Sequence, residues 1–204
     1  GFSSKPDNVQ YSMDYFNGKL IEFADALELN QFSLIGNSLG GALSLGLSLN
    51  KPERIKNLIL MGSGGIEDME TYNAMPGIQK LLSDFLGGEM NQEKIEGLLK
   101  LFPYDPSIIT DEMIEDRMQI LPLMNPQVLA SMKIPNLEDD LGKITHPMLV
   151  FWGMDDKFCP VSGASKIGQK CHDAQIILFS RCGHWVMIER EEIFNQTCID
   201  FLNR

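Results

Sequence analysis

Several features that indicate common functions are missing from this sequence. Its 28 acidic residues outnumber its 17 lysines and arginines, which gives a formal net charge of −11, and the chain has no run of basic residues. This charge does not suit binding to nucleic acid or to an anionic membrane surface. No stretch approaches the roughly 18 consecutive apolar residues of a membrane span, and the first residues lack a signal-peptide pattern. We therefore expect a cytoplasmic protein whose partner is neither nucleic acid nor a membrane.

Cysteine and nucleotide-binding motifs are also lacking. The four cysteines, Cys159, Cys171, Cys182 and Cys198, form no C-x-x-C pair and have no histidine at the spacing of a metal finger. Their simplest interpretation is that of reduced thiols in a cytoplasmic protein. Neither a Walker loop nor a G-x-G-x-x-G pattern is present. The sequence thus predicts no metal site and no cofactor.

What the chain does have is enough apolar material for one sizeable domain. It is 204 residues long and 44% hydrophobic, so a large core is expected. Continuous apolar runs at Phe32–Ile35 and Asn57–Met61 flank a helix of small residues, a pattern typical of a parallel sheet covered on both faces. Further strands are predicted at Pro147–Trp152 and Ala174–Phe179. Helices are predicted at Tyr11–Leu29, Val161–Cys171 and Glu189–Leu202.

The middle of the chain has a different pattern. Residues 66–140 contain no convincing strand and are rich in Met and Leu. Helical segments are predicted near Ala74–Leu86, Gln92–Phe102, Thr110–Leu121 and Pro126–Met132. We interpret residues 66–140 as a helical cap inserted into a core made of residues 1–65 and 141–204.

One stretch indicates chemistry. Gly36-Asn37-Ser38-Leu39-Gly40 matches G-x-S-x-G, the nucleophile elbow, in which a serine sits on a sharp turn from strand to helix. We expect the turn to crowd the backbone two residues on either side of Ser38, which would require glycine at both places. The amide of Leu39 could then donate to a developing oxyanion. The alternative is a glycine-rich turn without chemistry.

A serine nucleophile needs a base and an acid that orients it. Of three histidines, His146 and His172 precede strands, whereas His184 follows one and so lies at the carboxyl edge of the sheet, where ligands gather. Asp155 and Asp156 both follow a strand; we favour Asp156, with Asp155 as the alternative. The order Ser38, Asp156, His184 is the expected order for such a site, although a structural histidine and a solvated turn remain alternatives.

Four stretches carry a family resemblance. GNSLGG, GMDDKFCP, CGHWVMIE and TDEMIEDRM together resemble the meta-cleavage product hydrolases of the α/β-hydrolase superfamily. The resemblance implies an α/β-hydrolase fold with an inserted helical cap. It also implies a serine-dependent hydrolase that cleaves a carbon–carbon bond of 2-hydroxy-6-oxo-2,4-dienoate ring-fission products in the degradation of aromatic compounds. It places the acid at Asp156 and a substrate-binding arginine at Arg117.

Arg117 also stands out by itself. At helical spacing its neighbours are Met113, Ile114, Ile120 and Leu121, so no local carboxylate can pair with it. It could reach water or a distant acid, or it could face the cleft and bind an anionic substrate.

The resemblance further implies a mechanism. The acid end of the substrate binds near Arg117 and Asn37, and ketonisation makes the dienol an electron sink. Ser38 attacks the remote ketone, the carbon–carbon bond breaks, and water releases the second acid from the acyl-enzyme. Asn37, Leu39, Arg117, Trp185 and Cys182 are the predicted substrate-binding residues, since Cys182 and Trp185 flank His184 and Leu39 flanks Ser38.

The sequence departs from the family at its start. Proteins of this family begin with several strands, and a loop that supplies a second oxyanion donor, before the position that matches Gly1. We therefore expect a mostly parallel sheet without those strands, an exposed apolar edge at Phe32–Ile35, and a sequence that is part of a longer chain. The expected partner is a small-molecule substrate, and a homo-oligomer is possible. A carboxylesterase or lactonase with the same triad, or a catalytically silent binding domain, is the alternative function.

Overall fold

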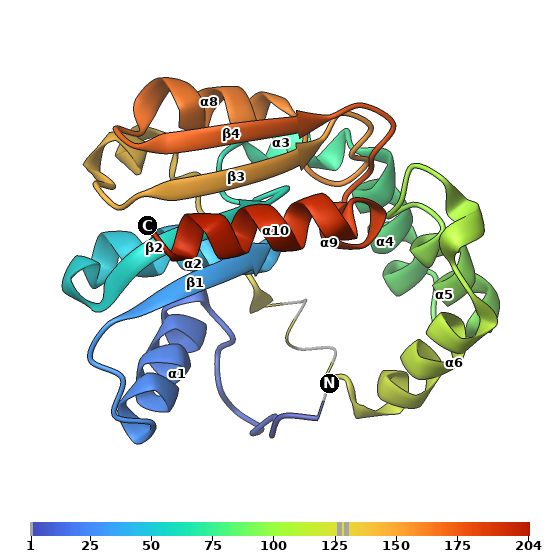
Figure 1. Cartoon of the computed structure of the whole chain (residues 1–204). Coiled ribbons are helices and arrows are strands. Elements are labelled where there is room, and N and C mark those ends of the chain that lie inside the picture. Colours follow the sequence, from blue (N-terminus) through green and yellow to red (C-terminus); the bar gives the residue numbers. More distant parts are fainter. Residues whose placement is uncertain (1, 126–127, 129–130) are drawn as a thin grey trace.

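Four parallel strands form the centre of the molecule. The computed structural model describes residues 2–125, 128 and 131–204 (Figure 1). Its strands β1 (Phe32–Asn37), β2 (Ile55–Met61), β3 (Met148–Gly153) and β4 (Ala174–Phe179) are parallel and lie in the order β1-β2-β3-β4. This confirms the predicted α/β architecture with a parallel sheet.

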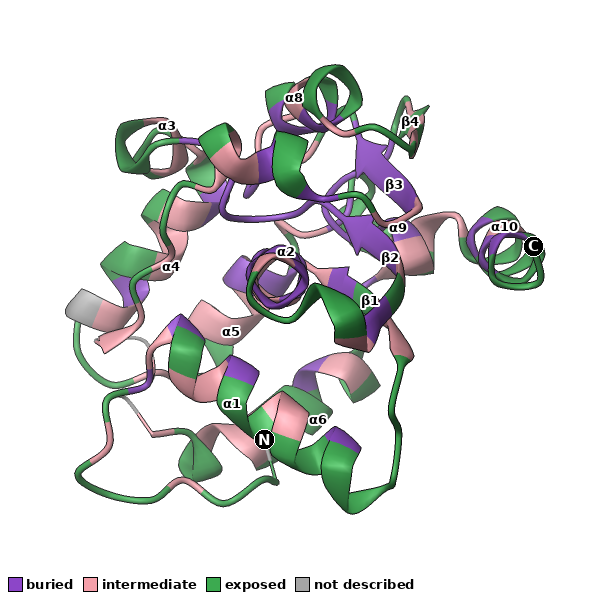
Figure 2. Cartoon of the chain, turned by 90° about the vertical axis from the view of Figure 1, so that its left-hand side faces the viewer, coloured by how far each residue is buried: buried purple, intermediate pink, exposed green. Residues whose placement is uncertain are grey.

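Both faces of the sheet are covered by helices, so the strands read as continuous apolar runs. Successive side chains of a strand point to opposite faces, and the two core clusters follow this rule. Leu58, Leu60, Val150 and Trp152 pack with α2 (Leu39–Asn50) and α8 (Ser162–Lys170). Helix α1 (Met13–Ala26) lies against α2 on the same face. Ile59, Met61, Leu149 and Phe151 pack against the C-terminal helix α10 (Glu191–Leu202) on the other face. Figure 2 shows this buried layer between α2 and α10.

Local signals explain where several helices begin. Ser12 caps α1 through a hydrogen bond from the Tyr15 amide, and Thr110 caps α6 (Asp111–Ile120) through the Met113 amide. The predicted C-terminal helix is interrupted at Arg190, whose φ of −134° separates α9 (Val186–Glu189) from α10. The predicted ends of the first helix and of Gln92–Phe102 were too late, since α1 ends at Ala26 and α5 (Gln92–Leu99) at Leu99.

Helices α4 (Pro76–Leu86), α5 and α6 of the middle segment lie to one side of the sheet, whereas α3 (Met69–Asn73) lies behind β3 and β4 in the view of Figure 1. Short 3-10 turns are η2 (Pro106–Ile108), η3 (Leu121–Leu123) and η4 (Glu138–Lys143), which packs against α8. Another, η1 (Pro52–Arg54), precedes β2. No strand occurs between β2 and β3 within the described residues. The predicted helix Pro126–Met132 falls mostly outside the described residues, and the division into core and cap at residues 66 and 140 stays a prediction.

Both ends of the middle segment are tied to α8. Lys166 on α8 contacts Glu67 Oε2 at 2.5 Å and Glu138 Oε2 at 2.8 Å, and Ser162 donates to Glu67 Oε1 at 2.6 Å. The amide of Leu137 donates to the carbonyl oxygen of Gly65 at 2.7 Å. Because the Glu67 side chain is only 7% exposed, its partners determine whether its charge is tolerated there.

The strand that leads to Ser38 is at one edge of the sheet. Within the described residues β1 pairs with β2 alone, and Ile35 is 54% exposed. The run Phe32–Ile35 is therefore at an edge of the sheet as expected, but only Ile35 is exposed, since Phe32 and Leu34 pack against the core. None of the described helices is both long enough and apolar enough to cross a membrane.

Candidate active site

Ser38 is the residue between β1 and α2, and its backbone is strained. Its φ of 56° and ψ of −115° lie in a region that residues other than glycine rarely adopt. Two hydrogen bonds impose this conformation: the Ser38 amide donates to the Met61 carbonyl oxygen at 3.0 Å, and its carbonyl oxygen accepts from the Gly64 amide at 2.9 Å. The end of β2 thus fixes the elbow, and the turn begins a helix directly after the serine.

The glycines of the elbow are not equally constrained. A Cβ at Gly36 would lie 2.4 Å from the Gly40 carbonyl oxygen, so glycine is required there as predicted. A Cβ at Gly40 would meet nothing within 4 Å, so the prediction that both flanking positions need glycine was wrong for Gly40. The second constrained position is Gly41, where a Cβ would lie 2.4 Å from Ser63 Oγ. The helix start therefore packs closely on the chain after β2.

Asp156 and His184 form a buried pair at the carboxyl edge of β3 and β4. His184 Nδ1 lies 2.7 Å from Asp156 Oδ2, and both side chains are 1% exposed. The other carboxylate oxygen of Asp156 accepts from the amides of Phe158 and Cys159 at 2.8 and 2.9 Å. Asp155, the alternative acid, is exposed, and its amide donates to the Cys182 carbonyl oxygen. Of the two candidate acids, the structure brings Asp156 to the histidine.

Sequence reasoning missed Gly62, which makes space for this pair. It follows β2 with a φ of +46°, and a Cβ there would lie 2.7 Å from Asp156 Oδ2 and 2.9 Å from His184 Nδ1. The local signal for it is the run Gly62-Ser63-Gly64-Gly65, which directly follows the predicted strand Asn57–Met61. Glycine is needed here because it adopts the positive φ without strain and because it has no Cβ to collide with the pair.

The Ser38 side chain makes no hydrogen bond with the base candidate His184 within the described residues. Among the described residues, the buried Nε2 of His184 has no hydrogen-bond partner. The Ser38 side chain is instead hydrogen-bonded to the Cys159 thiol. Burial and the charge of Asp156 raise the pKa of this thiol well above its usual value, and the hydrogen bond with Ser38 opposes the rise only in part. Catalytic hydrogen bonds are often incomplete without substrate. Nε2 therefore has an unused position for a hydrogen bond in the part of the chain that the structure describes.

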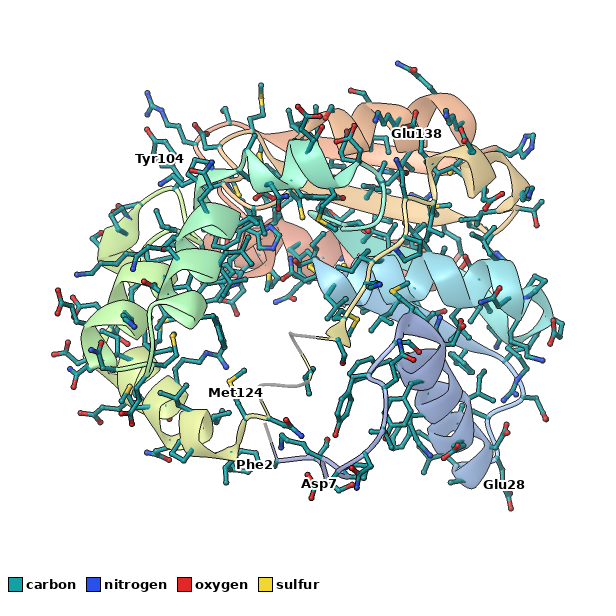
Figure 3. All side chains as sticks on the ribbon, turned by 180° about the vertical axis from the view of Figure 1, so that it is seen from behind. Phe2, Asp7, Glu28, Tyr104, Met124 and Glu138 are labelled. Carbon is teal, nitrogen blue, oxygen red and sulfur yellow. The ribbon has the colours of Figure 1, made fainter. Side chains whose placement is uncertain are left out.

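Arg117 lies on α6 beside a separate cavity. The cavity measures 340 Å³ and is lined by Phe2 (labelled in Figure 3), Leu99, Met113, Asp116, Arg117, Gln119, Ile120 and Trp185. Neither Ser38 nor His184 lines it. A larger cavity of 630 Å³, between the N-terminal segment, α1 and the residues Met124, Asn125 and Val128, is lined by none of the predicted site residues. In the described part of the chain, no three His, Cys, Asp or Glu side chains are grouped to hold a metal ion.

Comparison with known proteins decides the family. Residues 10–191 match the family model described as serine aminopeptidase, S33. The 2-hydroxy-6-oxo-6-phenylhexa-2,4-dienoate hydrolase of Burkholderia cepacia is 38% identical over 189 residues, which cover 87% of this chain and 65% of that protein. The 2-hydroxy-6-oxo-2,4-heptadienoate hydrolase of Pseudomonas putida is 30% identical over 99% of this chain and 74% of its own length. The chain belongs to the meta-cleavage product hydrolases.

Solved structures agree with this assignment. A meta-cleavage product hydrolase from Pseudomonas fluorescens IP01, solved as a serine-to-alanine variant with acetates, has a TM-score of 0.85 and 28% identity. The likeness covers all of this chain and 76% of that protein. The present chain thus spans 65% of the length of the Burkholderia cepacia relative and about three quarters of the structural one.

In this family member, the Asn37 side chain connects the elbow to the histidine loop. Its Nδ2 donates to the carbonyl oxygens of Met61 at 3.1 Å and of His184 at 3.2 Å. Both bonds are to the backbone, so the predicted contact of Asn37 with substrate would have to use its Oδ1. The visible role of the amide is to hold the loop of His184 against the end of β2.

Two other predicted substrate-binding residues are largely buried. Trp185 is 7% exposed, stacks on Phe102 with ring centres 4.6 Å apart, and lines the Arg117 cavity. Cys182 has no exposed surface and packs in the core with Phe151. Burial, with the nearby Glu189 carboxylate, raises the pKa of its thiol to about 12. Cys182 behaves as a small core side chain, so its position gives no support to a contact with substrate.

Proposed function

We propose that this protein hydrolyses a carbon–carbon bond in 2-hydroxy-6-oxo-2,4-dienoates formed by ring fission of aromatic compounds. Ser38 is the nucleophile, His184 the base, and Asp156 the acid that orients His184. The observation that carries the proposal is the buried Asp156–His184 pair, with contact of 2.7 Å and a free Nε2, beside a serine on a strained strand-to-helix turn. The relatives named for this reaction support the choice of substrate.

The proposed reaction begins when His184 Nε2 takes the proton of Ser38 as Oγ attacks the ketone carbon at position 6. As the first residue of α2, Leu39 has an amide without an acceptor in the helix, and it donates to the oxyanion. In the ketonised substrate, whose carbon 5 already carries the proton of the 2-hydroxyl, the bond between carbons 5 and 6 then breaks. Its electron pair passes through the enone to the oxygen on carbon 2, which takes the proton held by His184. Water, deprotonated by His184, releases the second acid from Ser38. Asp156 keeps Nδ1 bound, so that Nε2 faces the serine throughout.

Arg117 is proposed to bind the carboxylate of the substrate. It is exposed on α6, lies against a cavity, and has no carboxylate at helical spacing. The wall between this cavity and His184 is aromatic: Trp185 stacks on Phe102, whose ring centre is 5.8 Å from that of His184. In the proposed complex the substrate places its carboxylate at Arg117 and its ketone at Ser38.

The test is an assay of the full chain on a yellow dienoate, in which turnover is measured as the loss of the substrate's colour. Ser38→Ala should lower kcat by about 10³-fold or more, because it removes the nucleophile. Arg117→Ala should raise KM by about tenfold or more, because a charge-assisted contact to the carboxylate is lost. Arg204→Ala, which removes an exposed arginine at the C-terminus, is the matched control and should leave both constants unchanged. Colour loss that survives Ser38→Ala would contradict the proposal.

A carboxylesterase or lactonase remains the second candidate, because the Arg117 cavity is not lined by Ser38. A plain ester needs no cationic anchor. If Ser38→Ala abolishes turnover while Arg117→Ala matches the wild type, and simple esters are cleaved faster than the dienoate, the ester hydrolase is the better assignment.

A further inference from the structure

Glu189, the last residue of α9, joins two segments that are far apart in sequence. Its Oε1 accepts from the amide of Gly183 at 2.8 Å, and its Oε2 accepts from the amide of Tyr104 at 2.8 Å. Gly183 precedes His184, and Tyr104, labelled in Figure 3, lies in the turn that joins α5 to η2. One carboxylate thus holds the histidine loop to the middle segment.

The two segments are in close contact at this point. The amide of His184 donates to the Phe102 carbonyl oxygen at 2.7 Å. A Cβ at Gly183 would lie 2.3 Å from that same oxygen, so the approach depends on glycine. The Phe102 ring stacks on Phe158, at 4.2 Å, and on Trp185, at 4.6 Å. The turn of residues 102–104 therefore covers the loop of residues 182–185.

The carboxylate accepts from these two amides and, at 3.8 Å to Oε1, from the Cys182 thiol. The neighbouring guanidinium of Arg190 donates to the carbonyl oxygens of Ser180, Arg181 and Glu189, and so fastens the start of the same loop. Hydrogen bonds from amides to a carboxylate are charge-assisted and stronger than neutral ones. Both amides lie outside helices and strands, so Glu189 supplies an acceptor that secondary structure does not.

We propose that Glu189 is a positioning residue: it clamps residues 182–185 to residues 102–104 and so holds the His184 ring between Asp156 and Ser38. This inference rests on the proposed role of His184 as the base. A displacement of about 1 Å at a catalytic group can lower a rate by about 10²-fold. The His184 backbone is held at its amide by Phe102 and at its carbonyl by Asn37, and Glu189 fixes the residue just before it.

The test compares Glu189→Ala and Glu189→Gln with wild type in the full chain. Alanine removes both acceptors, and glutamine keeps the shape but only one acceptor oxygen. Glu192→Gln is the matched control, because Glu192 is an exposed glutamate in the first turn of α10. The measurements are the labelling rate of Ser38 by a fluorophosphonate probe, amide hydrogen exchange at Gly183 and Tyr104, and kcat and KM for the dienoate.

In Glu189→Ala we expect exchange at both amides to rise by about tenfold or more, and labelling and kcat to fall by about 10- to 100-fold. KM should change little, since Arg117 is untouched. Glu189→Gln should fall between this variant and wild type, and Glu192→Gln should match wild type. A fall in labelling and kcat at unchanged KM distinguishes a positioning role from a general loss of structure, which would also raise amide exchange in β3.

Labelling at the wild-type rate in Glu189→Ala, with both amides exchanging faster, would overturn the positioning role. Unchanged exchange would overturn the clamp itself. If the alanine variant does not fold, the same two readings apply to Glu189→Gln. A wild type that reacts with the probe but leaves the dienoate intact contradicts only the proposed substrate, and the clamp is still judged on the probe. A wild type without any labelling contradicts the proposed base, and the positioning role with it.

Discussion

Gly62→Ala should separate the two buried partners of the site with a single methyl group. The added Cβ would lie 2.7 Å from Asp156 Oδ2 and 2.9 Å from His184 Nδ1, both shorter than a normal contact to carbon. Neither side chain can easily move away, because each is 1% exposed and Asp156 also accepts two amide hydrogen bonds. The least costly movement is therefore one that lengthens the 2.7 Å contact between them.

Two terms determine the stability cost. Alanine at a φ of +46° costs about 1–2 kcal/mol relative to glycine, and overpacking a tight interior costs about 1–3 kcal/mol. The free energy of unfolding should thus fall by about 2–5 kcal/mol. Activity should fall further than stability suggests, because an unoriented histidine lowers kcat by up to about 10⁴-fold.

The assay is urea unfolding alongside kcat, on protein kept well below its unfolding midpoint. Gly18→Ala is the matched control: Gly18 is exposed in α1, a Cβ there meets nothing within 4 Å, and alanine should stabilise the helix by up to about 1 kcal/mol. A Gly62→Ala protein with wild-type kcat would refute the argument that this glycine makes space for the pair, whatever its stability.

Three further predictions concern the elbow, the anchor on α8 and the buried thiols. Gly36→Ala should lower the free energy of unfolding by about 1–3 kcal/mol because its Cβ meets the Gly40 carbonyl oxygen, whereas Gly40→Ala should be tolerated; equal unfolding midpoints in urea would contradict this. Lys166→Met should lower the free energy of unfolding by about 1–3 kcal/mol, because it leaves the Glu67 carboxylate without its ion-pair partner. A urea unfolding midpoint equal to that of wild type would show that Glu67 is satisfied without Lys166. Burial raises the pKa of the Cys171 and Cys198 thiols from 9.0 to about 11, so their contribution to stability is complete below pH 9 and is lost as the pH rises towards 11. The melting temperature should therefore fall between pH 9 and pH 11, and it should fall less steeply in a variant that lacks both thiols. If the melting temperatures of this variant and of wild type fall equally with pH, the thiols do not contribute in this way.

Much of the fold could be predicted because its signals are local. The strands are continuous apolar runs, and their direction follows from the helices between them. The cap of α6 follows from Thr110, and the elbow from five consecutive residues. The order of Ser38, Asp156 and His184 could be read in the same way, since residues after parallel strands meet at one edge of the sheet.

Local patterns therefore suffice to predict the parallel sheet, the turn at Ser38 and the candidate acid and base, since each depends on neighbours within a few positions. The packed fold was needed to choose Asp156 over Asp155, to show that Gly62 rather than Gly40 is sterically required, and to bring Glu189 to Tyr104. These features depend on contacts between chain segments separated by tens of residues. No local pattern encodes such distances, because they are set by how the strands and helices pack.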